Sequence, residues 1–298
     1  MEEKVFAPRE VIFREGDQGT SFYQILSGTA GVYVNYGTPE EQKLTDMKPG
    51  QYFGEMAVIE AWPRSTTIVA EDELRVLEIP ESDLNEYFKA QPDKIYALMK
   101  QLSGRIRSLT EEYEEVAAFL QEKREDAAPK NDGFFARLKK IRRLSAMAKK
   151  NAALYTAETE IRLREFGRPA DSPLPIEEYG KGTIIVRQGE TGEYMFAVHG
   201  GAVGIYTNYG TALENKLTTL YANSFFGEMG MLDLEPRSAT AVAEEDGTII
   251  EVIRPADLEE LSKSNPIEVD MILCHLSNRL RRLTKDYVAA CEEAVADA

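Results

Sequence analysis

The fold is decided by the stretch Phe53-Gly54-Glu55-Met56-Ala57, followed by Pro63-Arg64-Ser65-Thr66-Thr67. The same pattern recurs as Phe226-Gly227-Glu228-Met229-Gly230, followed by Pro236-Arg237-Ser238-Ala239-Thr240. This order of residue types predicts a strand, a glycine turn, one short helical turn and a second strand. Because so long a motif occurs twice, we expect a duplicated domain.

The repeat extends well beyond this motif. Val11–Ala70 aligns without a gap on Ile184–Ala243 when the sequence is shifted by 173 positions, and about 25 of the 60 positions are identical. After a one-residue slip, residues 103–110 align on 277–284. The repeated unit is therefore a β-rich body followed by a helix.

Short runs with alternating apolar residues fill each body. Tyr23–Leu26, Ala30–Val34 and Gln42–Thr45 are predicted strands. The repeated Asn35–Thr38 and Asn208–Thr211 are typical of hairpin turns, in which glycine supplies a positive φ. Short strands with frequent turns indicate a small antiparallel barrel or sandwich.

After each body the apolar residues follow the helical period, and so the fold class is α+β, with helices flanking each barrel. The first helix is predicted to run to about Glu125, where a segment containing Pro129 and Gly133 ends it. The apolar stripes are Ile95, Leu98, Leu102, Ile106, Leu109 and Tyr113, and then Met271, Leu276, Leu280, Leu283 and Tyr287.

The repeated motif has the chemistry of a sugar phosphate site. The start of a short helix offers backbone N–H groups to an anion, and an arginine can close over that anion with a bidentate contact. Glu55 and Glu228 are acceptors suited to a sugar hydroxyl, and a neighbouring glycine lets the backbone approach a ligand closely. The alternative is that Glu55–Arg64 and Glu228–Arg237 are structural ion pairs within a loop. Preservation of the motif in both copies favours a site.

These segments resemble the phosphate-binding cassette of cyclic nucleotide-binding domains, the domain found in the catabolite activator protein and the protein kinase A regulatory subunit. The glycine-punctuated loops Arg14–Gly19 and Arg187–Gly192 resemble an earlier loop of that domain. The resemblance covers about 5–120 and 175–290 and implies two eight-stranded β-rolls that bind cAMP or cGMP, with no other cofactor. The implied ligand-binding residues are Gly54, Glu55, Met56, Ala57, Arg64, Ser65, Gly227, Glu228, Met229, Gly230, Arg237 and Ser238.

In those implied roles, the glutamates take the ribose 2′-hydroxyl and the arginines take the cyclic phosphate. The resemblance also implies that a residue from the helix behind each barrel covers the base. Packing in the helix core explains the leucines and tyrosines among the candidates equally well. The candidates are Arg107, Leu109, Thr110 and Tyr113, with Arg281, Leu283, Thr284 and Tyr287 in the second copy. Each arginine is followed by a serine and not a threonine, which favours adenine as the base of the ligand.

The expected organisation is a first domain over residues 1–126, a basic helical linker over 127–170 and a second domain over 171–298. Residues 134–150 carry seven basic residues and no acid, with apolar residues at helical spacing. This helix can pair with the acidic end of the preceding helix, dock on a membrane surface or an acidic partner, or present Arg142-Arg143-Leu144-Ser145 as a kinase A substrate or inhibitor sequence.

Composition excludes several other classes. The 298 residues suit two ordinary domains, no run reaches 18 apolar residues, and the charged start is not expected to act as a signal peptide. A net charge of −16 disfavours DNA binding. Cys274 and Cys291 are expected to be reduced thiols. We expect no metal site, because His199 and His275 lie far apart in the sequence without ligand-like neighbours.

The leading hypothesis is a cytoplasmic regulatory protein in which a cyclic nucleotide moves the helices behind each barrel and alters a contact with an unidentified protein, or with a second copy through those helices. The main alternative is a scaffold whose cassettes no longer bind. A transcription factor is disfavoured, because only eleven residues follow Tyr287. An enzyme is disfavoured, because no nucleophile–base pair, metal cluster or phosphate loop is recognisable.

Overall fold

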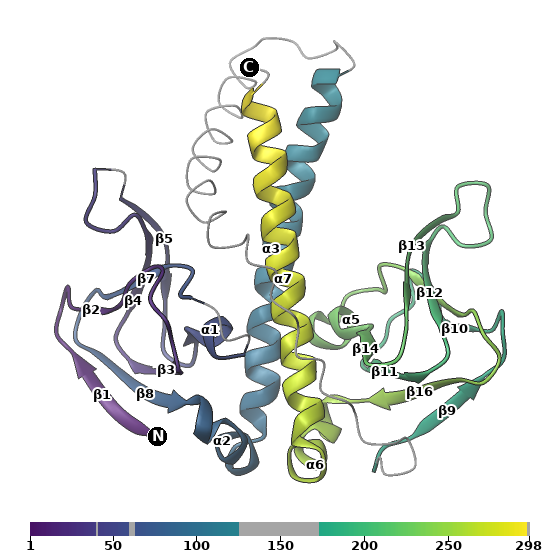
Figure 1. Ribbon diagram of the computed structural model, residues 1–298, viewed down its shortest axis with the longest axis horizontal. Coiled ribbons are helices and arrows are strands. Elements are labelled where there is room, and N and C mark those ends of the chain that lie inside the picture. Colours follow the sequence, from purple (N-terminus) through teal and green to yellow (C-terminus); the bar gives the residue numbers. More distant parts are fainter. Residues whose placement is uncertain (40, 60–62, 125–172, 297–298) are drawn as a thin grey trace. The chain divides into compact units, whose positions relative to one another are not determined.

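A computed structural model describes residues 1–39, 41–59, 63–124 and 173–296 of the chain (Figure 1). Backbone contacts divide these residues into two compact units, which we describe separately. The first contains residues 1–84, 104–124 and 277–296, and the second contains 85–103 and 173–276. The expected linker over 127–170 and its kinase-like sequence lie outside the described residues.

The first unit contains a barrel of two four-stranded antiparallel sheets, in the strand orders β1-β8-β3-β6 and β2-β7-β4-β5. The short helix α1 (Glu55–Ile59) follows β6, and a 3-10 turn over Glu81–Asp83 follows β8. The strands are β1 (Glu2–Phe6), β2 (Val11–Phe13), β3 (Ser21–Ser27), β4 (Ala30–Val34), β5 (Gln42–Met47), β6 (Tyr52–Phe53), β7 (Thr67–Ala70) and β8 (Leu74–Pro80).

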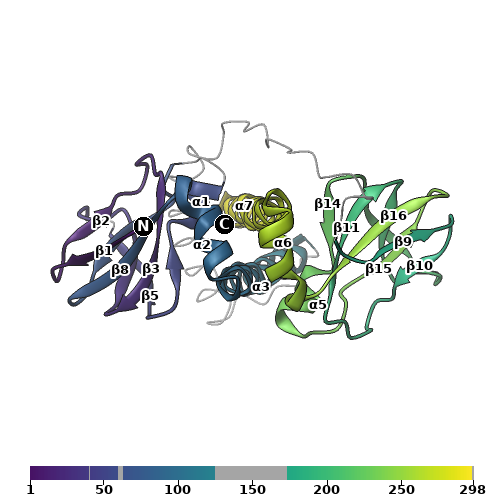
Figure 2. The ribbon, with the colours of Figure 1, turned by 90° about the horizontal axis from the view of Figure 1, so that it is seen from below.

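The second unit repeats this barrel with the sheet orders β14-β11-β16-β9 and β10-β15-β12-β13 (Figure 2). Helix α5 (Glu228–Asp233) takes the place of α1. The strands are β9 (Ile176–Tyr179), β10 (Ile184–Val186), β11 (Met195–Gly200), β12 (Val203–Thr207), β13 (Asn215–Leu220), β14 (Ser224–Phe226), β15 (Thr240–Ala243) and β16 (Thr248–Ile253). The predicted pair of antiparallel β-rolls is confirmed.

Each barrel is held together by apolar side chains that its two sheets turn toward each other. In the first barrel Ile25 and Val76 from one sheet meet Ile68 from the other, and all three are buried. Burial of one such side chain contributes about 1.5–3 kcal/mol. Tyr23 of β3 and Phe53 of β6 stack at 5.1 Å between ring centroids, and β6 leads directly into the first cassette.

The predicted hairpin turns are confirmed by their backbone angles. Asn35 and Asn208 both have φ 53°, in the left-handed region that asparagine tolerates better than most residues. The N–H of Thr38 donates to the carbonyl of Asn35 at 3.1 Å, and Thr211 repeats this bond to Asn208. Turn geometry therefore explains why these residues recur in both copies.

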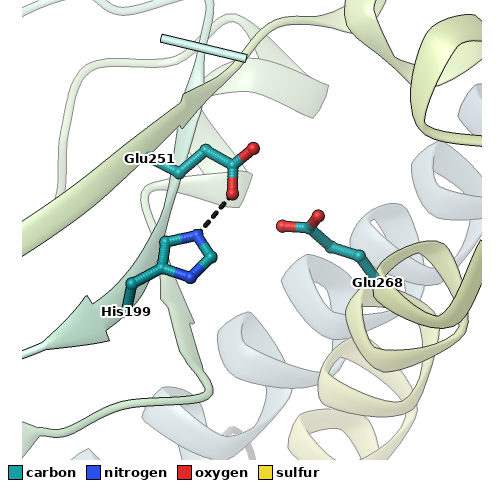
Figure 3. Close-up of side chains that lie close together, drawn as sticks. All are labelled: His199, Glu251 and Glu268. Atoms are coloured by element: carbon teal, nitrogen blue, oxygen red, sulfur yellow. Dashed lines mark hydrogen bonds and ion pairs between the residues drawn. The ribbon is translucent and has the colours of Figure 1, made fainter. Parts of the chain in front are cut away.

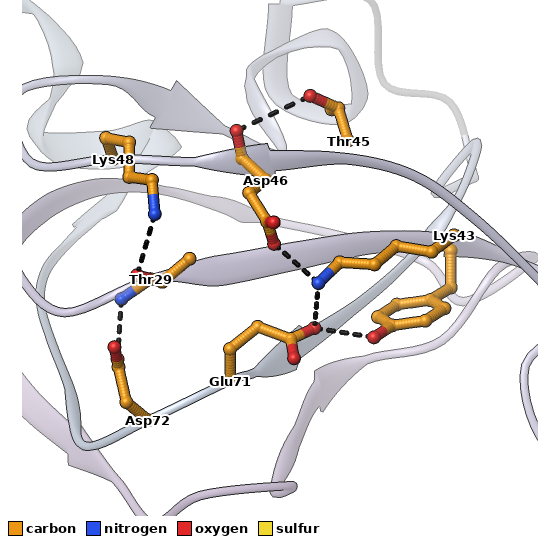
Figure 4. Close-up of polar contacts among 8 residues, drawn as sticks. Thr29, Lys43, Thr45, Asp46, Lys48, Glu71 and Asp72 are labelled. Carbon is orange, nitrogen blue, oxygen red and sulfur yellow. Dashed lines mark hydrogen bonds and ion pairs between the residues drawn. The ribbon is translucent and has the colours of Figure 1, made fainter.

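A polar network covers the outer face of the sheet that contains β4 and β5 (Figure 4). Glu71 accepts a hydrogen bond from the Tyr33 hydroxyl at 2.5 Å and forms an ion pair with Lys43 at 3.0 Å. Lys43 also reaches Asp46 at 2.7 Å. The second barrel repeats this arrangement with Tyr206, Lys216 and Glu244.

Replacing Glu71 with glutamine is expected to lower the free energy of unfolding by less than about 1 kcal/mol, measured by urea denaturation. The effect is small because the Lys43 and Glu71 side chains are 37% and 29% exposed. Glu244→Gln serves as the matched variant and should behave in the same way. A loss above about 3 kcal/mol would show that the network holds the barrel together.

Four helices follow the strands: α2 (Leu84–Ala90), α3 (Asp93–Arg124), α6 (Leu258–Ser264) and α7 (Pro266–Ala296). Within the first unit, the C-terminal parts of α3 and α7 lie side by side (Figure 1 and Figure 2). Val116 and Phe119 of α3 pack with Tyr287, Cys291 and Ala294 of α7, all buried. No helix in the described parts of the chain is both long and apolar enough to span a bilayer.

Candidate functional site

The first cassette is built around Arg64, whose backbone is fixed by the glycine loop upstream. The Arg64 N–H donates to the carbonyl of Asp17, and the Gly16 N–H donates to the carbonyl of Arg64, both at 2.8 Å. Gly16 has φ +88°, a conformation that favours glycine. The loop that the sequence singled out therefore holds the arginine in place.

The Arg64 guanidinium lies inside the cassette and is only 4% exposed. It donates to the carbonyls of Gly54 at 2.7 Å and Ser21 at 2.5 Å, and it lies over the Phe13 ring at 4.2 Å. Its Nε is buried and has no hydrogen-bond partner among the described residues. Burial lowers the pKa of Arg64, but a guanidinium still keeps its proton. A buried cation with an unused donor is suited to receive an anion.

Two glycines make room for this guanidinium. A Cβ on Gly54 would lie 2.5 Å from Nη1 of Arg64, and a Cβ on Gly19 would overlap its Cζ and Nε. Gly54 also has φ +78°, whereas Gly19 has an ordinary backbone conformation. The requirement for glycine at position 19 is therefore steric.

The second cassette repeats the arrangement. Arg237 is 5% exposed and donates to the carbonyls of Gly227 at 2.5 Å and Tyr194 at 2.6 Å. Tyr194 aligns with Ser21 in the repeat. A Cβ on Gly192 would overlap the guanidinium, as one on Gly19 would in the first cassette. Both cassettes therefore present a buried guanidinium held by two backbone carbonyls.

The glutamate of the first cassette is bonded to a helix and not to Arg64. Glu55 is 2% exposed and forms an ion pair with Nη1 of Arg105 in α3. Nη2 of Arg105 also contacts the sulfur of Met56 at 3.7 Å. The structural ion pair between Glu55 and Arg64 that the sequence left open is therefore replaced by separate partners for the two residues. Arg105 was missed as a site residue, although its repetition as Arg279 was a signal.

In the second unit, α5 is bonded to the first part of α3. The hydroxyl of Ser103 lies 2.9 Å from Asp233 and 3.2 Å from the sulfur of Met229, and it is fully buried. Glu228 begins α5 and is 2% exposed, directly after Gly227 with φ +76°. The predicted glutamate is thus buried at the start of the short helix in this copy as well.

The remaining predicted residues occupy varied surroundings. Ala57 and Gly230 are buried, Met56, Met229 and Ser65 are partly buried, and Ser238 is exposed.

Among the base-covering candidates, the hydroxyls of Thr110 and Thr284 already donate to carbonyls of their own helices, at 2.8 and 2.7 Å. Arg107 lies partly buried on α3. Burial lowers the pKa of Arg281 on α7 to about 10.

The chain is similar in sequence to a protein kinase regulatory subunit and to a protein kinase. The chain is 25% identical over 287 residues to the cAMP-dependent protein kinase regulatory subunit of Blastocladiella emersonii, covering 96% of this chain and 56% of the relative. It is 25% identical over 241 residues to the cGMP-dependent protein kinase of Plasmodium berghei (strain Anka), covering 81% of this chain and 21% of the relative. The chain therefore spans about half, or less, of the length of these relatives.

Solved structures give weaker similarities. One described as cAMP bound PfPKA-R is 18% identical, with a TM-score of 0.35, and the match covers 89% of this chain and 75% of that chain. The catabolite activator protein of Thermus thermophilus is 32% identical, with a TM-score of 0.33, over 38% of this chain and 53% of that chain.

The family itself is shown by a sequence model. The model of the cyclic nucleotide-binding domain matches residues 3–91 and 176–265, one match for each barrel and together more than half of the chain. The chain belongs to the cyclic nucleotide-binding domain family and carries two copies of the domain.

Proposed function

We propose that the chain is a regulatory protein whose two cassettes each bind a cyclic nucleotide, cAMP or cGMP, and that binding repositions the helices behind the barrels. The carrying observation is the buried Arg64 guanidinium with an unused Nε donor, matched by a buried Arg237 in the second barrel. A ring phosphate supplies the anionic oxygens that accept hydrogen bonds from such a guanidinium in a bidentate contact.

In each site the arginine takes the phosphate and the glutamate takes the ribose 2′-hydroxyl. Glu55 and Glu228 are both about 2% exposed, and so a hydroxyl bonded to either is shielded from competing water. The backbone around Met56 and Ala57, and around Met229 and Gly230, lines the phosphate, with Ser65 and Ser238 beside it. This assignment gives the same role to the same position in both copies.

The names of relatives support this choice of ligand and output. They include cAMP-dependent protein kinase regulatory subunits and cGMP-dependent protein kinases. Both cAMP and cGMP therefore enter the proposal, and the output we propose is a changed contact with a protein partner.

The link from ligand to helix runs through Arg105. Arg105 is held by Glu55, the carboxylate that we assign to the ribose. When a ribose hydroxyl binds, the oxygens of Glu55 are shared between that hydroxyl and Arg105. The two donors then compete for Glu55, and this competition shifts the position of α3. Occupancy of the first site thus changes the helix that carries the packed residues Val116 and Phe119.

Thermal unfolding tests the proposal directly. Protein refolded from denaturant, and so freed of bound nucleotide, is expected to unfold at least about 5 °C higher with saturating cAMP or cGMP, because a ligand that binds only the folded state stabilises it. The matched control is 5′-AMP, whose phosphate is an open monoester and not part of a ring. Absence of a shift with both cyclic nucleotides would favour the scaffold with non-binding cassettes.

Glu55→Gln is expected to weaken binding of the active cyclic nucleotide at the first site by about 10- to 100-fold, because a hydrogen bond to a charged acceptor contributes about 1.5–3 kcal/mol. Affinity for the 2′-deoxy analogue should stay unchanged. The titration uses chains that also carry Arg237→Ala, so that the measured binding comes from the first site. An equal loss of affinity for the cyclic nucleotide and for its 2′-deoxy analogue would show that Glu55 does not bind the ribose hydroxyl.

Arg105→Ala is expected to leave a functional first site but to disconnect α3 from it. Hydrogen exchange followed by mass spectrometry should show ligand-dependent protection along α3 of the normal chain. That change should be lost in the variant at saturating ligand. Arg75→Ala is the control, since that arginine is 53% exposed and pairs with Glu3 on the barrel surface. Unchanged protection of α3 in Arg105→Ala would place the coupling elsewhere.

A further inference from the structure

A cluster of His199, Glu251 and Glu268 lies in the second unit (Figure 3). His199 is on β11, Glu251 is on β16, and Glu268 is in the first turn of α7. One nitrogen or oxygen from each side chain lies within 4.8 Å of the others. The expectation that His199 has no ligand-like neighbour is therefore wrong, because the fold brings together residues that are far apart in the sequence.

The cluster is buried and rich in acceptors. The side chains of His199 and Glu251 are 3% and 0% exposed, and Nε2 of His199 lies 2.5 Å from Glu251. Glu268 is also fully buried, and its Oε1 has no hydrogen-bond partner within the described residues. Figure 3 shows its carboxylate directed toward the other two side chains. Two carboxylates beside one imidazole are costly to keep charged in a buried site, and either a proton or a bound cation can neutralise them.

Asn265 orients the carboxylate of Glu268. Nδ2 of Asn265, at the end of α6, donates to Oε2 of Glu268 at 3.0 Å, and the Glu268 N–H donates to the Asn265 carbonyl. These bonds hold one oxygen of Glu268 and leave Oε1 facing the cluster. Outer hydrogen bonds of this kind commonly orient metal ligands.

The first barrel shows that the fold does not require these residues. Leu77 pairs with Gln24, and Glu251 pairs with Ala197 at the equivalent strand position, so that Leu77 corresponds to Glu251. In the sequence repeat, Leu26 corresponds to His199 and Lys94 to Glu268. The same fold therefore places two leucines and a lysine where the second copy places three ligating side chains.

We propose that His199, Glu251 and Glu268 bind one divalent transition metal ion, Zn²⁺ or Mn²⁺, between the second barrel and the first turn of α7. An imidazole nitrogen with carboxylate oxygens suits these ions better than Mg²⁺ or Ca²⁺, which prefer oxygen ligands alone. Ligands of a tetrahedral ion of this kind lie about 3.3–3.6 Å apart, and so the ligand atoms, which lie within 4.8 Å of one another, have to close by up to about 1.4 Å. Nε2 of His199 and the Glu251 oxygen, which lie 2.5 Å apart, have to separate by about 0.9 Å to bind one ion together. Because the ligands are buried, the ion is taken up as the chain folds.

The test refolds the full chain with Zn²⁺, Mn²⁺, Ca²⁺ or Mg²⁺, removes free ion by gel filtration, and measures bound metal by mass spectrometry and stability by thermal unfolding. We expect about one Zn²⁺ or Mn²⁺ per chain and unfolding about 5 °C higher than after refolding with EDTA. Binding of Ca²⁺ or Mg²⁺ alone would overturn the assignment to a transition metal.

Two variants locate the ion. Glu268→Gln keeps the size of the side chain and is expected to lose both the bound metal and the metal-dependent stability. The double variant His199→Leu with Glu251→Leu copies the leucines of the first barrel and should do the same while remaining folded. His275→Gln, which removes the other histidine, should bind as the unchanged chain does. Less than about 0.1 ion per chain in the unchanged protein, or full binding by Glu268→Gln, would overturn the proposal.

Discussion

Replacing Arg64 with alanine is expected to weaken cyclic nucleotide binding at the first site by at least about 30-fold, and Arg237→Ala should do the same at the second. Each arginine is 4–5% exposed, and so the bound phosphate would lose its charged partner without water to replace it. Truncating one partner of such a buried pair typically costs about 2–5 kcal/mol, which corresponds to roughly 30-fold or more. Calorimetric titration of each variant should retain one binding event and lose the other.

Two controls separate this effect from general damage. Arg75→Ala and Arg254→Ala remove arginines whose side chains are 53% and 51% exposed, and neither should change affinity. Arg64→Lys keeps the positive charge but loses the planar pair of donors. We therefore expect a loss of nucleotide affinity between that of the unchanged chain and that of Arg64→Ala. An affinity within about threefold of normal in both alanine variants would refute the assignment of the cassettes.

Gly19→Ala is expected to displace the Arg64 guanidinium although the arginine itself is unchanged. The added Cβ would overlap Cζ and Nε of Arg64, which is held between the carbonyls of Gly54 and Ser21. Overpacking of this kind lowers the free energy of unfolding by about 1–3 kcal/mol. We also expect at least a 10-fold loss of nucleotide affinity at the first site. Gly192→Ala should have the same effect on Arg237 and the second site.

The chain provides a matched control for this substitution. A Cβ on Gly104, within α3, meets no other atom within 4 Å. Gly104→Ala should therefore raise the free energy of unfolding by about 0.5–1 kcal/mol, because alanine is the better helix former. If Gly19→Ala binds nucleotide as tightly as Gly104→Ala does, the guanidinium does not need the position seen in the structure.

The sequence predicted the two barrels because the relevant signals are local and occur twice. Alternating runs gave the strands, the left-handed Asn35 and Asn208 mark the turns, and the apolar stripe gave the helix that the structure shows as α3. Within that stripe Ile95, Leu98, Leu102 and Ile106 are fully buried. Agreement between local periodicity and tertiary packing made this part of the fold predictable.

The partners of the site residues could not be predicted in the same way, because they depend on tertiary contacts. An ion pair between Glu55 and Arg64 was the alternative to a ligand site, whereas in the fold Glu55 pairs with Arg105 and Arg64 donates to two backbone carbonyls. The recurrence of Arg105 as Arg279 in the repeat indicated that the position is important, but it did not indicate which residue the arginine contacts. The cluster of His199, Glu251 and Glu268 had no sequence signal, since it joins two strands and a helix.

Isothermal titration of nucleotide-free chain with cAMP and cGMP tests the central claim most directly, because it reports affinity and stoichiometry together. We predict that at least one of the two nucleotides binds with a stoichiometry of about two per chain. One event should be lost in Arg64→Ala, the other in Arg237→Ala, and both in the double variant. Absence of heat with both nucleotides at several temperatures, from folded protein freed of bound ligand, would contradict the account.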